Sequence, residues 1–239
     1  MTVVPFLYAS AVIDRRYNEN CMTTLDQRLQ RLARARLYAI VDTGYVEPDR
    51  VPHVTEQLVL GGVDLIQLRA KKLPLAAIAE LGKKMRAIIP SEGPLFILND
   101  HPELVSEIGA DGIHVGQDDL SVTEARAKAG GGVIVGKSTH SLNQAIAAEK
   151  EGADYIGVGP IYATPTKPDY VPVGPALIGQ VSSAVRVPQF CIGGINEQTL
   201  PEVIAAGAQR VVIVSALLQS SDIQAYCKRV KAQMENVSK

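Results

Sequence analysis

The sequence contains few cysteines and no dense cluster of positive charge. Its three cysteines, Cys21, Cys191 and Cys227, are widely spaced and form no C-x-x-C pair. This spacing fits neither a disulfide framework nor a zinc site, and we expect a reducing, cytoplasmic compartment. The formal net charge is −1 and no run is rich in lysine and arginine, which argues against a nucleic-acid partner. Any anionic ligand is therefore expected to be small and locally held.

The N-terminal part lacks an apolar run long enough to cross a membrane. Residues 3–13 are apolar, but this stretch has only 11 residues, whereas a spanning helix needs about 20. It also lacks a basic flank, so a signal peptide is not favoured. We expect no membrane partner, and we interpret residues 1–36 as an N-terminal extension that is partly helical, with a leading helix within residues 24–37.

A short phrase occurs four times along the chain and marks a repeated unit. Its copies are GGVDLIQL at 61–68, IGADGIHV at 108–115, EGADYIGV at 151–158 and AGAQRVVIV at 206–214. Each copy begins where an amphipathic helical pattern stops, with glycine suited to the end of a helix. Each then runs into β-branched and apolar residues, so the phrase predicts a junction from helix to strand.

Completing this period gives eight predicted strands that alternate with helices. Near-continuously apolar strands of this kind are typical of a parallel sheet covered by helices. We therefore predict an α/β protein, a (β/α)8 TIM barrel over residues 37–239 that carries the catalytic site. An open Rossmann sheet lacks its fingerprint here, because the glycines at 129–132 precede a strand. The predicted strands are 38–42, 63–69, 94–98, 111–115, 133–137, 154–158, 188–192 and 210–214.

Polar residues at the ends of the predicted strands indicate where the site lies, because barrel enzymes use the C-terminal ends of their strands. In the second strand Gln67, Arg69 and Lys71 alternate with apolar residues and so project to one side. A buried guanidinium needs a partner. We weigh two partners for Arg69, an internal carboxylate and a bound anion.

The third and fourth strands end in acidic residues. Asn99 and Asp100 follow the third strand and Asp119 follows the fourth, so neighbouring loops bring the two carboxylates together. Mg²⁺ prefers one or two carboxylates completed by phosphate oxygens and water, and this predicts a magnesium site. Each Asp alone could instead be a helix N-cap, and spacing does not choose between Asp118 and Asp119.

The fifth strand ends with Ser138 and His140, which place a hydroxyl and an imidazole at the predicted mouth, while Ser141 is expected to cap the next helix. His114 lies in mid-strand and is interpreted as a residue packed inside the barrel rather than as a base. The sixth strand leads into a loop with Thr164, Thr166 and Lys167. These donors suit an anionic oxygen, although a proline-rich solvated loop is the alternative.

The last two strands end in sequences suited to a phosphate. The seventh ends in CIGGI and the eighth in VVIVSA. The glycine pair lets backbone N–H groups approach a ligand, and the loops after these strands form a recurrent phosphate site in such barrels. Two anion sites in one mouth, one of them assisted by Mg²⁺, predict a transferase that joins a diphosphate substrate to a monophosphate acceptor.

The motifs QLRAK, ND, GIHVGQDD, GKSTHS, GPIYATPTK, IGGI and VSA occur in this order and resemble the thiamine-phosphate synthase family over about residues 37–232. The resemblance implies Mg²⁺-dependent coupling of 4-amino-2-methyl-5-(diphosphomethyl)pyrimidine to a thiazole phosphate, with release of pyrophosphate. It also favours Asp119 over Asp118 as the metal ligand.

The resemblance further implies a role for each matched residue. The pyrimidine diphosphate would be held by Gln67, Arg69, Lys71 and Asn99, with Lys167 on its diphosphate and Ser138 on its ring. Thr164 and Thr166 would meet the thiazole, and Asp100 and Asp119 would bind Mg²⁺. The thiazole phosphate would be held by the backbone of Gly194, Val214 and Ser215. Catalytic roles fall to Arg69, Lys71, Lys167 and Ser138.

Three rival functions stay open on the sequence alone: a thiazole tautomerase, another phosphate-binding isomerase or aldolase, and a non-catalytic thiamine-phosphate sensor. The first and the last need neither a diphosphate site nor a metal pair, and an isomerase or aldolase would want a base or a Schiff-base lysine at a strand end. The sequence also leaves open whether the chain forms a homo-oligomer, the contacts of the loop at 168–176, and whether the thiazole carries a carboxylate.

Overall fold

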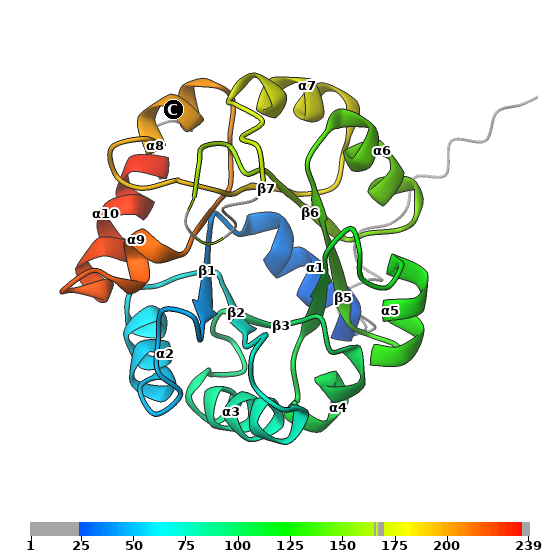
Figure 1. Ribbon diagram of the computed structural model, residues 1–239, viewed down its shortest axis with the longest axis vertical. Helices are drawn as coiled ribbons and strands as arrows, with labels where there is room; N and C mark the ends of the chain where they lie inside the picture. The colour runs from blue at the N-terminus through cyan, green and yellow to red at the C-terminus, as the bar shows by residue number, and fades with distance from the viewer. Residues whose placement is uncertain (1–23, 165, 167–169, 236–239) are drawn as a thin grey trace, which may run out of the picture.

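The computed structural model describes residues 24–164, 166 and 170–235. Eight parallel strands form a closed barrel in which each strand pairs with the next and β8 pairs with β1 (Figure 1). The predicted (β/α)8 barrel is therefore confirmed. The strands are β1 Leu37–Asp42, β2 Leu65–Arg69, β3 Leu95–Asn99, β4 Gly112–Val115, β5 Ile134–Thr139, β6 Tyr155–Val158, β7 Gln189–Cys191 and β8 Val211–Ile213.

Helices surround the barrel and follow the strands in the expected alternation (Figure 1). Ser141 accepts a hydrogen bond from the Gln144 N–H and caps α6, as the sequence predicted. The helices are α1 Thr24–Arg34, α2 Val51–Leu60, α3 Leu75–Ile88, the 3-10 turn η2 Pro102–Leu104, α4 Val105–Ile108, α5 Val122–Ala129, α6 Leu142–Lys150, α7 Ala176–Ala184, α8 Leu200–Ala205, α9 Ser215–Leu218 and α10 Ile223–Glu235.

The repeated phrase forms the junctions between helices and strands, and its acidic residue has a structural role. Asp64, Asp111 and Asp154 occupy equivalent places in three copies. Each carboxylate accepts a backbone N–H at the start of the preceding strand: Asp64 from Leu37, Asp111 from Phe96 and Asp154 from Val135. The phrase therefore ties neighbouring strands together at the N-terminal end of the barrel.

Helix α1 lies across that N-terminal end and covers it (Figure 1). Leu32 is fully buried beneath it. Arg28 forms an ion pair with Asp111 at 3.0 Å, and Arg31 donates to the Ser91 carbonyl just before β3 at 3.0 Å. Because these partners all precede strands, the opposite, C-terminal end of the barrel is left for a ligand.

Three aromatic rings fill the interior of the barrel. Tyr38 of β1, Tyr155 of β6 and Phe190 of β7 pack edge to face with centroids 5.5–6.0 Å apart. Gly136 of β5 makes room for Tyr155, because a Cβ atom at position 136 would lie 2.1 Å from the Tyr155 ring. The interior is thus a packed core beneath the mouth.

None of the helices in the described ranges is long and apolar enough to cross a membrane.

Candidate active site

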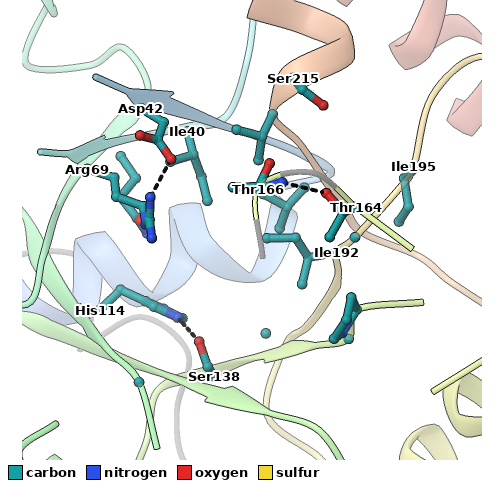
Figure 2. Close-up of a pocket in the computed structure, with 18 of the residues that line it drawn as sticks. Ile40, Asp42, Arg69, His114, Ser138, Thr164, Thr166, Ile192, Ile195 and Ser215 are labelled. Carbon is teal, nitrogen blue, oxygen red and sulfur yellow. Dashed lines mark hydrogen bonds and ion pairs between the residues drawn. The ribbon is translucent and has the colours of Figure 1, made fainter. Parts of the chain in front are cut away.

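A cavity of about 280 Å³ opens at the C-terminal ends of the strands (Figure 2). Every site residue predicted from the sequence lines it, except Lys167, which lies outside the described residues. The strands and their following loops contribute Gln67, Arg69, Lys71, Asn99, Asp100, Asp119, Ser138, Thr164, Thr166, Gly194, Val214 and Ser215 to its wall.

Arg69 has an internal partner in this structure. Its guanidinium contacts the Asp42 carboxylate at 2.5 Å, and both side chains are largely buried (Figure 2). The parallel register sets Asp42 directly beside Arg69 at the ends of β1 and β2. Of the two partners considered for Arg69, the internal carboxylate is therefore present. Arg69 nevertheless lines the cavity. Asp42 also accepts the Gly44 N–H, which fixes its position.

Asp100 and Asp119 meet at the mouth, beside Lys71. Lys71 Nζ lies 3.0 Å from Asp100 Oδ2, and Asp119 accepts the Gly116 N–H at 2.7 Å. Asp100 adopts a left-handed backbone with φ of 67°, a conformation that Asp tolerates better than most residues and that clusters at functional sites. Asp100 itself lines the cavity.

The two carboxylates perturb each other. Burial raises the pKa of Asp100, and the neighbouring Asp119 raises it further against the opposing effect of Lys71. Burial also raises the pKa of Asp119, but the Gly116 N–H, the hydrogen bond with Asp100 and the charges of Lys71 and Lys137 together lower it. The two shifts run in opposite directions, so Asp100 is the carboxylate of the pair that takes up a proton first as the pH falls.

The N-cap alternatives for these two residues are wrong. The caps are His101 for η2 and Leu104 for α4, neither with a side-chain hydrogen bond. The cap of α5 is Ser121, which forms a capping box with Glu124. Asp119 lines the cavity whereas Asp118 does not.

Ser138 lies deeper in the cavity and contacts His114. The His114 Nε2 atom is 2.9 Å from Ser138 Oγ (Figure 2), and the other ring nitrogen, Nδ1, is 3.1 Å from the Tyr155 hydroxyl. His114 is therefore inside the barrel, as interpreted from the sequence, and it also lines the cavity. His140 lines the same wall and bonds through Nδ1 to the Gly159 carbonyl.

Thr164 and Thr166, which follow β6, line one side of the cavity. Thr164 Oγ1 accepts the Thr166 N–H at 3.3 Å (Figure 2). The Thr166 hydroxyl lies 3.0 Å from the Tyr45 hydroxyl, which belongs to the loop after β1. This contact joins two loops that are far apart in sequence and holds both threonines at the mouth.

Backbone donors face the cavity after β7 and β8. Gly193 and Gly194 have positive φ angles of 99° and 65°, which favour glycine. Within the described part of the chain, the N–H groups of Gly194, Val214 and Ser215 donate no hydrogen bond. These groups are therefore available to an anion.

Sequence reasoning missed Asp42, Tyr45 and the two tyrosines inside the barrel. Asp42 had a signal, because it ends the first strand just as Arg69 ends the second. Tyr45 had none, since its partner lies 121 positions away in the chain.

The described residues contain no group of three or more His, Cys, Asp or Glu side chains that could hold a metal ion. The donor set of the mouth is a pair of carboxylates. Such a pair fits Mg²⁺, whose remaining ligands are commonly phosphate oxygens and water, and does not fit a zinc site closed by protein ligands.

Comparison with known proteins identifies the family. A family model described as "Thiamine monophosphate synthase" matches residues 37–217. A thiamine-phosphate synthase of Shouchella clausii is 41% identical over 204 residues, covering 85% of this chain and 98% of that protein. One from Halalkalibacterium halodurans is 43% identical over 195 residues, covering 81% of this chain and 92% of its own.

Solved structures agree with this similarity. A thiamine phosphate pyrophosphorylase from Pyrococcus furiosus superposes with a TM-score of 0.76 at 29% identity, covering 88% of this chain and 98% of that one. A geranylgeranylglyceryl phosphate synthase from Thermoplasma acidophilum has a TM-score of 0.68 at 15% identity, covering 90% of this chain and 100% of that one, and shares the fold alone. The chain therefore belongs to the thiamine monophosphate synthase family and is a transferase of that family.

Proposed function

We propose that this protein joins 4-amino-2-methyl-5-(diphosphomethyl)pyrimidine to a thiazole phosphate, giving thiamine phosphate and pyrophosphate. The observation that carries the proposal is one cavity lined by two different sets of groups suited to an anion. Arg69 and Lys71 lie beside the Asp100–Asp119 pair on one side. Backbone N–H groups that donate to no acceptor among the described residues lie on the other side, after β7 and β8. A diphosphate suits the first set and a monophosphate the second.

Asp100 and Asp119 would hold Mg²⁺, which when bound supplies positive charge to the diphosphate oxygens. Burial raises the pKa of Asp100, Lys71 opposes this, and Asp119 adds a smaller rise, so a cation bound here would offset the cost of burying this charge. Arg69 and Lys71 would bind the same diphosphate, since both line the cavity. Lys167 is proposed to join them, on the resemblance described above.

The proposed reaction breaks one bond and forms another. The C–O bond of the pyrimidine methylene breaks, and its electron pair leaves with the diphosphate. The thiazole nitrogen then donates its lone pair to the methylene carbon and becomes positively charged. Arg69 and Lys71 stabilise the negative charge that develops on the departing oxygens, a contribution worth roughly 3–4 kcal/mol per donor in other enzymes. Ser138 would orient the pyrimidine, and Thr164 and Thr166 the thiazole, which supplies proximity.

The test is pyrophosphate release from both substrates, measured with Mg²⁺ and after its removal with EDTA. We expect release to stop in EDTA and to resume when Mg²⁺ is restored. The Asp100→Ala and Asp119→Ala variants should each lose about 100-fold or more in kcat, the scale of losing one preorganised charge contact. Asp118→Ala is the matched control, because Asp118 lies beside Asp119 but does not line the cavity.

Product formation that continues undiminished in EDTA would exclude the metal site. Turnover of the thiazole phosphate without the pyrimidine substrate would instead indicate a tautomerase.

A further inference from the structure

A continuous chain of hydrogen bonds crosses the interior of the barrel from β2 to β5. Gln67 Nε2 donates to the Tyr38 hydroxyl, which lies 3.0 Å from the Tyr155 hydroxyl. The Tyr155 hydroxyl lies 3.1 Å from His114 Nδ1, and His114 Nε2 lies 2.9 Å from Ser138 Oγ. Gln67, His114 and Ser138 line the cavity, whereas Tyr38 and Tyr155 lie behind its wall.

The number of protons available determines which group donates and which accepts at each step of this hydrogen-bond chain. Burial raises the pKa of both tyrosines well above the ordinary value, so each phenol carries its single proton. Tyr38 accepts from Gln67, and its own proton has Tyr155 as its acceptor among the described residues. The Tyr155 hydroxyl then has His114 Nδ1 as the acceptor for its own proton, at 3.1 Å.

The direction determines what the cavity presents to a ligand. A histidine that accepts at Nδ1 carries its proton on Nε2, and here Nε2 faces Ser138 Oγ. Ser138 then accepts from His114, and its own O–H is left to donate into the cavity. At the other end, the Gln67 Oε1 carbonyl has no partner among the described residues. Among the described residues, the side-chain atoms that are both fully buried and unpaired are Arg210 Nε and the Tyr226 hydroxyl. Because Gln67 Oε1 is unpaired but is not one of these, it is not fully buried, and it faces the cavity that Gln67 lines as an acceptor.

We propose that Tyr38 and Tyr155 are positioning residues that hold His114 in its Nε2–H tautomer and thereby make Ser138 a hydrogen-bond donor to the ligand. Reversing the chain would exchange the two ends: Ser138 would accept and Gln67 would donate. The donor at Ser138 and the acceptor at Gln67 match a ring nitrogen beside an amino group. The ligand part of the inference rests on the function proposed above, since an aminopyrimidine carries that pair.

Packing around the tyrosines makes the chain rigid. Tyr155 packs edge to face against Tyr38 and Phe190, and the absence of a side chain at Gly136 leaves the space its ring occupies. Neither phenol can leave the chain without disturbing this core. The barrel therefore fixes the positions of the hydroxyls, and the hydroxyls fix the protons.

The direct test is the tautomer of His114 in the full-length, ligand-free protein, observed by long-range ¹H–¹⁵N correlation of the histidine rings. The protein has four histidines, and a His114→Gln variant identifies which signal belongs to His114. We expect the Nε2–H pattern in the natural protein. We expect mixed tautomers in Tyr155→Phe, which removes the donor to Nδ1, and in Tyr38→Phe, which interrupts the chain one step earlier.

Tyr226→Phe is the matched control, because the Tyr226 hydroxyl is also buried but has no hydrogen-bond partner in the described residues. Its His114 signals should equal those of the natural protein. An Nδ1–H tautomer in the natural protein, or a pattern unchanged by Tyr155→Phe, would overturn the proposal. Tyr38→Phe answers the same question if Tyr155→Phe does not fold.

Kinetics separate this proposal from the proposed function. We expect Tyr155→Phe to lower kcat/KM for the pyrimidine diphosphate about 10-fold, the scale of one hydrogen bond, with KM for the thiazole phosphate unchanged. An equal loss for both substrates would count against positioning through Ser138. If His114 shows the expected tautomers but no pyrophosphate is released by any variant, the proposed function fails and the role of the tyrosines stands.

Discussion

At the scale of single residues, the mouth of the barrel holds its cations against carboxylates. Arg69 contacts Asp42 and Lys71 contacts Asp100. An arriving anion therefore meets charges that are already oriented, and it must compete with carboxylates for them. Lys71 is about half exposed, at 48%, whereas Arg69 and Asp42 are largely enclosed. The Arg69–Asp42 pair is thus the one whose disruption should be felt by the fold.

Asp42→Asn should lower the free energy of unfolding by about 1–3 kcal/mol, because it leaves a largely buried guanidinium without a countercharge. The measurement is urea denaturation followed by circular dichroism. Adding inorganic pyrophosphate should raise the melting temperature of this variant more than that of the natural protein, since the anion replaces the lost charge.

Glu197→Gln is the control for Asp42→Asn. It breaks an ion pair with Arg229 whose arginine is mostly exposed, and surface pairs of this kind contribute about 0–1 kcal/mol. Equal losses in the two variants would show that the Arg69–Asp42 pair is not special to the enclosed mouth.

Two cysteines should be unreactive in the folded protein. Burial raises the pKa of Cys191 and of Cys227 to about 12, so both thiols stay protonated at pH 8 and cannot act as nucleophiles. In a Cys21→Ser background we expect almost no reaction with Ellman's reagent until urea is added. Because the folded pKa is raised, the stability linked to these thiols is present below about pH 9 and is lost between about pH 9 and 12. Rapid labelling without urea would contradict this.

At the scale of elements, the helix-to-strand junctions were readable from the sequence and their acidic residues were not. The repeated phrase predicted where strands begin because glycine ends a helix and β-branched residues follow. The role of Asp111, which accepts the Phe96 N–H and pairs with Arg28 and Arg86, depends on elements that only the closed barrel brings together. Helix α1 was likewise expected as a helix, but nothing in its sequence says which end of the barrel it covers.

Leu32→Ala tests whether α1 is part of the barrel's stability. Leu32 is 1% exposed, and removing a buried leucine side chain costs about 2–5 kcal/mol. We expect a loss in that range in the free energy of unfolding, with kcat little changed because the site lies at the other end. Leu60→Ala on α2, where Leu60 is 54% exposed, should cost less than about 1 kcal/mol. Equal losses in the two variants would show that α1 packs only loosely.

At the scale of the whole molecule, topology made the residues that line the cavity predictable. In a parallel barrel all the C-terminal strand ends meet at one rim, so the sequence alone places Arg69, Asp100, Asp119 and Ser138 in one group. The register that sets Asp42 beside Arg69 needs the relative positions of two strands. The Tyr38–Tyr155 contact spans 117 positions across the interior. The repeat of helices and strands in the sequence indicates which residues lie at the same rim of the barrel. It does not indicate which of their side chains contact one another.

The covering of the N-terminal end by α1 and the aromatic packing of Tyr38, Tyr155 and Phe190 turn the cavity into a dead end. In the proposed reaction both substrates would enter through the mouth, and we expect the one seated deeper to enter first and its product to leave last. Initial-rate measurements should therefore show an ordered sequence, with the coupled product competing against only one of the two substrates. If the coupled product competes with both substrates, the two substrates can enter the cavity in either order. The closed inner end of the cavity would then not determine the order in which substrates bind and products leave.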